Sequence, residues 1–88
     1  MRPTYQVEFL RSAAKELAAL PKVIQQRIAS VIDNLSNDPR PPGTKALQGD
    51  GKYLRLRVGD YRVIYQVADD RLVVLVVKVG HRRDVYQR

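Results

Sequence analysis

Two parts of the chain alternate hydrophobic and polar residues in the manner of β-strands. In the first part, Tyr5, Val7 and Phe9 are separated by single residues, which predicts a short N-terminal strand. In the second part, residues 53–58 alternate strictly, and a glycine–aspartate pair then turns the chain into another strand over residues 61–68. The pattern therefore predicts a sheet that draws strands from both ends of the sequence.

Between these parts, hydrophobic residues recur at the three- and four-residue spacing of helices. Ser12 is the expected N-cap of a first helix over residues 13–20, which are rich in strong helix formers. Pro21 interrupts that helix and suits the first turn of a second one, from Lys22 to about Leu35. The hydrophobic face of the second helix is formed by Val23, Ile24, Ile28, Val31, Ile32 and Leu35. The two helices should form an antiparallel pair.

The last strand decides the expected order of the sheet. After a loop at residues 37–43, the run 72–77 is hydrophobic throughout, so a strand from Leu72 to Val79 should be buried on both faces. Such a strand is interior and needs a neighbour on each edge, which the preceding strand and the N-terminal strand supply. The fold class is α+β: an N-terminal strand, a two-helix hairpin and a three-stranded antiparallel meander. The four-stranded sheet has the order second, third, fourth, first along the chain, with the helices on one face.

The length and net charge of the chain limit the number of domains and the kind of ligand to expect. Eighty-eight residues are too few for two hydrophobic cores, so residues 1–88 should form a single domain. The net charge is +7, and arginine outnumbers lysine 11 to 5. Arginine presents a planar fork that binds phosphate through two hydrogen bonds, so this bias favours a phosphate-bearing ligand. The same charge would also attract an acidic protein partner.

Several kinds of site are disfavoured by the composition. The chain has no cysteine and one histidine, so we expect no disulfide, no metal site and no cofactor. No hydrophobic stretch approaches the roughly 20 residues that span a bilayer, and the N-terminus lacks the hydrophobic segment of a signal peptide. A cytoplasmic protein without a membrane partner is the expectation.

Basic and hydroxyl side chains gather at the ends of two predicted strands, within residues 55–62 and 80–86. Because the last strand runs antiparallel to the one before it, the second cluster should return to the start of strand 61–68. Arginines can stabilise a pentavalent phosphorane without a metal, and a histidine titrates near neutral pH. The residues expected to converge are Arg55, Arg57, Arg62, His81, Arg82, Arg83 and Tyr86. The alternative is a solvated basic strand with an inert histidine.

Two motifs in these segments resemble the RelE/ParE superfamily of bacterial toxins: VGDYRVIYQV at residues 58–67 and VGHRRDVY at residues 79–86. The resemblance extends to the leading strand, the helix pair and residues 47–49. The ending RRDVY resembles the RelE branch, whose members cleave mRNA in the ribosomal A site. The resemblance thus implies an endoribonuclease that inhibits translation by metal-free 2′-hydroxyl attack. It also implies a co-expressed acidic antitoxin that forms an oligomer with the toxin and blocks its basic surface.

The resemblance also implies separate roles for three residues. Arg62 matches the arginine that stabilises the phosphate in the transition state. Arg82 matches a residue proposed as an acid or charge stabiliser near the leaving group. Tyr86 matches a C-terminal tyrosine that orients the nucleophile or stacks on a base.

The same resemblance does not identify the general base. Arg55 and Tyr53 occupy the two positions where well-studied members have a lysine proposed for this role, and neither replaces a lysine. The candidates are, in order, His81, Tyr86 and Lys52, although a one-residue offset predicts that Lys52 faces away from the site. The residues expected to bind RNA are Lys45, Lys52, Arg57 and Arg83.

Two other functions compete with mRNA cleavage. One is a ParE-like inhibitor of DNA gyrase without nuclease activity, a branch that more often lacks the terminal tyrosine present here as Tyr86. The other is a basic RNA-binding or adaptor domain that retains the fold without the activity. Growth arrest, gyrase inhibition and ribosome-dependent cleavage distinguish the three.

Overall fold

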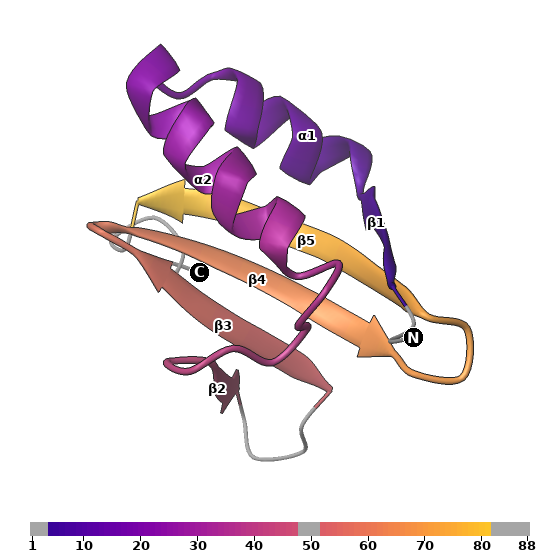
Figure 1. The fold of residues 1–88 in the computed structure, drawn as a ribbon. Coiled ribbons are helices and arrows are strands. Elements are labelled where there is room, and N and C mark those ends of the chain that lie inside the picture. Colours follow the sequence, from indigo (N-terminus) through magenta and orange to yellow (C-terminus); the bar gives the residue numbers. More distant parts are fainter. Residues whose placement is uncertain (1–3, 48–51, 82–88) are drawn as a thin grey trace.

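Two helices lie on one side of a five-stranded sheet in the computed structural model, which describes residues 4–47 and 52–81 (Figure 1). The elements are β1 (Gln6–Phe9), α1 (Arg11–Ala18), α2 (Lys22–Asn34), β2 (Lys45–Leu47), β3 (Tyr53–Val58), β4 (Tyr61–Ala68) and β5 (Val73–His81). The predicted α+β class and the predicted sequence of strand, helix pair and meander are confirmed. Across the described ranges, no helix is both long enough and apolar enough to cross a membrane.

The strand order is β1-β5-β4-β3-β2. The predicted neighbours are confirmed, because β5 lies between β4, to which it is antiparallel, and β1, to which it is parallel. The predicted number of strands was wrong: β2 adds a fifth strand to the outer edge of β3. Three residues after a proline-rich loop are too few for alternation to reveal a strand.

The two faces of the sheet differ in what covers them. On the helix side, Val74, Val76 and Val79 of β5 are buried, whereas Val73 and Leu75 on the other side are half-buried. The prediction that both faces of β5 are buried was therefore wrong. We call the second face the open side, because no described helix covers it (Figure 1).

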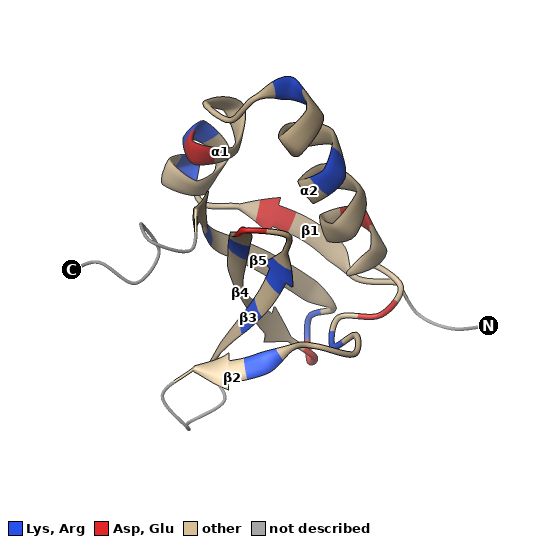
Figure 2. Cartoon of the chain, turned by 90° about the vertical axis from the view of Figure 1, so that its left-hand side faces the viewer, with Lys and Arg blue, Asp and Glu red and all other residues tan. Residues whose placement is uncertain are grey.

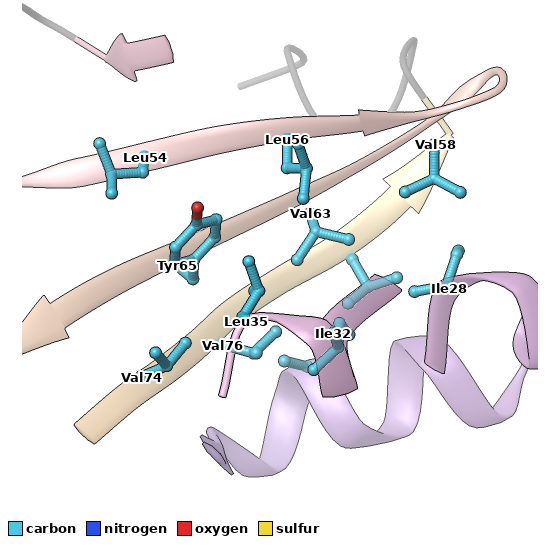
Figure 3. Packing of buried hydrophobic residues seen from close by; sticks show 12 residues of the cluster. Ile28, Ile32, Leu35, Leu54, Leu56, Val58, Val63, Tyr65, Val74 and Val76 are labelled. Atoms are coloured by element: carbon cyan, nitrogen blue, oxygen red, sulfur yellow. The ribbon is translucent and has the colours of Figure 1, made fainter. Parts of the chain in front are cut away.

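The hydrophobic core lies between α2 and the helix side of the sheet (Figure 3). Its largest buried side chain is Tyr65 of β4, whose hydroxyl donates a 2.7 Å hydrogen bond to the carbonyl oxygen of Pro39. Leu54, Leu56 and Val58 of β3 reach the same core. Since side chains alternate along a strand, this packing directs the arginines of β3 to the open side. The core thus fixes which face of the sheet carries the charge.

The helix hairpin begins and turns differently from the prediction. α1 starts at Arg11 with Leu10 in the N-cap position, so the prediction that Ser12 caps the helix was wrong. Pro21 occupies the N-cap of α2 rather than its first turn. The side-chain nitrogen of Gln25 donates to the carbonyl oxygens of Ala18 at 3.0 Å and Leu20 at 2.7 Å. These bonds satisfy carbonyls that the end of α1 leaves without helical partners.

Asp69 joins three distant parts of the chain at the turn between β4 and β5. Its carboxylate accepts a 2.7 Å hydrogen bond from the Tyr5 hydroxyl, just before β1. It also accepts two hydrogen bonds from the Arg40 guanidinium, at 3.2 and 2.9 Å, in the loop after α2. The Arg40 hydrogen bonds, followed by that of Tyr5, lower the pKa of Asp69 to about 2.

We expect this cluster to make the fold sensitive to acid. Because the pKa of Asp69 is lowered on folding, its stabilisation is present above its unfolded pKa of about 3.9 and is lost as pH falls toward 2. Melting temperatures of the wild type and of Asp69→Asn, measured from pH 6 to pH 2, should therefore converge at the acidic end. A gap of constant size across this range would contradict the assigned role.

Candidate nucleic-acid interface

Cations on the open side form two cross-strand pairs among the described residues. Arg57 of β3 lies directly opposite Arg62 of β4. Lys45 of β2 lies directly opposite Arg55 of β3. We call these four residues the cation rows; Figure 2 shows how basic positions recur along the strands beneath the helices. Like charges directly opposite each other destabilise a sheet unless an anionic group compensates them. A bound polyanion would remove the repulsion.

Arg62 differs from the other members of the cation rows in its burial. It is 5% exposed, although it lies on the open side. Its neighbour on β5 is Gly80, which has no side chain, and Ile64, two residues along the same face, is also buried. Burial in a packed surface restricts the positions that a guanidinium can adopt. A group that must stabilise a transition state needs this restriction.

His81 lies on the other side of the sheet from the cation rows. The register places it opposite Tyr61, and the two rings meet edge to face with centroids 5.5 Å apart. Both rings line a hollow against α1, together with Glu16 and Leu20. The end of β5 does return to the start of β4, as predicted, but the imidazole points away from Arg62. The backbone prediction was confirmed and the expected convergence of side chains was not.

Lys52 lies on the open side, against expectation. It precedes β3, so the alternation within that strand does not determine its direction. Its ammonium lies 5.8 Å from the centre of the Tyr53 ring, and it lines a hollow with Gln66 and Leu75. The prediction that a one-residue offset directs Lys52 to the opposite face was therefore wrong.

The structure thus brings together Arg55, Arg57, Arg62 and Lys45, with Lys52 farther along the same side. Three predicted site residues lie outside the described residues: Arg82, Arg83 and Tyr86. Within residues 4–47 and 52–81, no three histidine, aspartate or glutamate side chains are grouped so that they could hold a metal ion. The described interface is cationic and offers hydrogen-bond donors to phosphate.

Known proteins share both the sequence and the fold. Residues 7–86 match the family described as the ParE toxin of type II toxin–antitoxin system, parDE. A RelE-like toxin protein of Escherichia coli is 41% identical over 86 residues, which cover 93% of this chain and 90% of the relative. The mRNA interferase toxin RelE of Escherichia coli K12 is 32% identical over 80 residues, which cover 89% of this chain and 83% of the relative.

Solved structures of toxin–antitoxin complexes contain chains with a similar fold. A chain in the archaeal RelE–RelB complex of Pyrococcus horikoshii superposes with a TM-score of 0.80 at 34% identity, covering 90% of this chain and 96% of that one. A chain in the intact RelBE toxin–antitoxin complex of Escherichia coli superposes with a TM-score of 0.77 at 28% identity, covering 88% of this chain and 95% of that one. The resemblance predicted from the two motifs is confirmed: the chain belongs to the RelE/ParE superfamily of type II toxin–antitoxin toxins, in its RelE-like branch.

Proposed function

We propose that this RelE-like toxin cleaves mRNA on the ribosome. Relatives named mRNA interferases support the reaction class. The observation that carries the proposal is the pair of cation rows on the open side, where Arg57 opposes Arg62 and Lys45 opposes Arg55. An RNA backbone carries one negative charge per nucleotide, so it can neutralise successive cations along one face. This surface therefore fits a single-stranded RNA better than a compact anion.

The proposed chemistry is attack of a ribose 2′-hydroxyl on the adjacent phosphorus, with departure of the 5′-oxygen. The 2′-hydroxyl loses its proton to a base, the new P–O bond closes a ring, and the leaving oxygen gains a proton from an acid. The products are a 2′,3′-cyclic phosphate and a 5′-hydroxyl end. In this scheme Arg62 stabilises the charge on the phosphorane through its guanidinium.

The proton transfers need a group other than the arginines, because a guanidinium stays protonated in proteins. The position of His81 on the helix side makes it a weaker candidate than its sequence position suggested. We therefore propose Tyr86 for proton transfer and Arg82 for charge stabilisation near the leaving group, on the resemblance to the RelE branch. Orientation of the mRNA by the ribosome can lower the activation free energy by up to about 7–11 kcal/mol. A weak base then has to supply less of the rate acceleration.

We also propose that an acidic antitoxin binds this toxin and forms a hetero-oligomer with it. Structures of related toxins were solved as complexes with RelB antitoxins. The net charge of +7 favours an acidic partner, and a segment across the cation rows would compete with RNA. Because the proposed substrate is translated mRNA, we expect the complex in the cytoplasm.

Cleavage on programmed ribosomes tests the proposed function. The purified protein should cut mRNA bound in a ribosomal complex and leave the same naked mRNA intact. The downstream fragment should accept phosphate from a polynucleotide kinase without phosphatase treatment, because its 5′ end is a hydroxyl. Cleavage that leaves a 5′-phosphate, or equal cleavage of naked RNA, would exclude the proposed mechanism.

The match to a family named for ParE keeps gyrase inhibition as the second candidate. A supercoiling assay with purified DNA gyrase, run at the same protein concentrations, separates the two. We expect intact supercoiling activity at concentrations that cleave ribosome-bound mRNA. Loss of supercoiling with no mRNA cleavage would replace the first function with the second. Binding of RNA with neither effect would identify an adaptor domain.

A further inference from the structure

A hollow of about 480 Å³ opens on the open side, beyond the cation rows. This volume lies within the usual range for small-ligand sites, about 300–1,000 Å³. Its lining combines opposite charges, an amide and hydrophobic side chains, and includes Glu8, Lys52, Gln66, Ala68, Arg71 and Leu75. Apart from Lys52, which the sequence indicated as an RNA-binding residue, none of these residues has been given a role above.

The polar lining is ordered by the strand register. Glu8 of β1 lies opposite Leu75 of β5, which in turn lies opposite Gln66 of β4. One row across three strands therefore presents a carboxylate, a hydrophobic side chain and an amide in succession. Such a row suits a planar group that is hydrophobic on its face and polar along its edge, as a nucleobase is.

Two cations stand at the sides of the hollow, Lys52 before β3 and Arg71 in the turn before β5. Both are exposed. Within the described part of the chain, Glu8 and Arg71 form no ion pair with each other or with another residue, although they line the same hollow. The hollow therefore offers Glu8 as an acceptor for a base edge and Arg71 as a donor for phosphate oxygens.

The hollow is also within reach of an RNA strand that contacts Arg62. Gln66 is four residues from Arg62 on the same face of β4, a separation of about 13 Å at ~3.3 Å per residue. A stacked nucleic-acid strand rises about 3.4 Å per nucleotide, so no more than about four nucleotides separate the two points. One RNA strand can therefore occupy the cation rows and the hollow together.

We propose that this hollow is a base-binding subsite for the same RNA strand, within about four nucleotides of the cleaved bond. The proposal rests on the function proposed above. The base contacts Leu75 and Ala68, and its flanking phosphates contact Lys52 and Arg71. An ionised carboxylate only accepts hydrogen bonds, so Glu8 favours a base with an exocyclic amino group: adenine, cytosine or guanine. Uracil has no amino group, and its one edge donor, N3–H, lies between two carbonyl oxygens that repel the carboxylate.

The direct test measures binding without cleavage. Fluorescence anisotropy at low salt compares octamers of uridine and of cytidine, which carry equal charge; the Glu8→Gln variant controls for their different stacking. Wild-type protein should prefer the cytidine octamer by about 5- to 150-fold, which corresponds to the roughly 1–3 kcal/mol of a good base-edge contact. Glu8→Gln, whose amide can also donate to a carbonyl, should bring this ratio close to one. Asp33→Asn removes the same charge from the exposed surface of α2 and should leave the ratio unchanged.

Cleavage provides a second, separate readout. Ribosome complexes carry mRNA randomised over four positions on each side of the cleaved bond, and the cut fragments are sequenced. The wild type should disfavour uracil at one of these positions, and Glu8→Gln should remove that bias. Equal binding of both octamers, or a preference that survives in Glu8→Gln, would overturn the subsite. If the wild type cleaves nothing, the proposed function fails, while the octamer comparison still decides the subsite.

Discussion

Replacing Arg62 with glutamine should slow cleavage of ribosome-bound mRNA by about 100-fold or more, the loss seen when a preorganised charge stabiliser is removed. Arg62 is the buried member of the cation rows, held between Arg57 across the hairpin and the side-chain-free Gly80 on β5. Glutamine keeps a polar group there but removes the charge that we propose stabilises the phosphorane. The single-turnover rate at saturating protein measures the chemical step apart from binding.

Two further variants separate charge from shape and position. Arg62→Lys keeps the charge but loses the planar fork, so an intermediate rate is expected. Arg27→Gln removes the same group from α2, on the helix side near the turn between β3 and β4. It should cleave at the wild-type rate, because that guanidinium cannot reach RNA on the open side. All variants should melt cooperatively; a rate for Arg62→Gln within about tenfold of the wild type would reject the assigned role.

Much of this site could be predicted from the strand pattern. Strict alternation in residues 53–58 places Arg55 and Arg57 on one face, and the two-residue turn that follows brings Arg57 opposite Arg62. These features depend on local geometry, since a tight turn and a period of two determine the register. The superfamily motifs then associate the same residues with phosphate chemistry.

The side chains at strand ends could not be predicted in the same way. His81 is the last residue of β5, and its direction depends on an irregularity in pairing between Ile64 and Tyr65. An extra residue in one strand inverts the alternation beyond it, and the hydrophobic run of β5 has no polar positions that would reveal the shift. The prediction thus placed the backbone correctly and the imidazole on the wrong side of the sheet.

The hollow beyond the cation rows was missed for a different reason. Its row joins β1 to β5 and β4, and these strands meet only after the helix hairpin has returned the chain. Glu8 lies 58 positions from Gln66, so no local pattern links the two. The sequence contains only an indirect indication of the hollow: Gln66 follows Arg62 by four residues and therefore lies on the same face of the strand.

The cation rows also connect stability with function. Each row opposes two positive charges across a strand pair, and like charges directly opposite each other destabilise a sheet. In the proposed complex, RNA phosphates between the cations would relieve this repulsion. Substitutions that relieve it without RNA should therefore stabilise the free protein and weaken binding.

The double variant Lys45→Gln/Arg57→Gln tests this connection, because it neutralises one cation in each row. Its free energy of unfolding should rise by a few tenths of a kcal/mol up to about 1 kcal/mol, the scale of single cross-strand pairs. The melting temperature should rise accordingly, at about 4–8 °C per kcal/mol for a chain of this size. Its affinity for single-stranded RNA should fall. The slope of log K against log salt should also decrease by about 0.7 for each phosphate that the variant no longer neutralises.

The matched control is Lys15→Gln/Arg27→Gln, which removes one lysine and one arginine from exposed positions on the two helices. It lowers the net charge by the same amount, so any general relief of repulsion within a chain of charge +7 appears in both variants. Only the sheet variant should combine higher stability with weaker RNA binding and a smaller salt slope. Equal changes in the two variants would show that net charge, rather than the opposed cations of the open side, determines both properties.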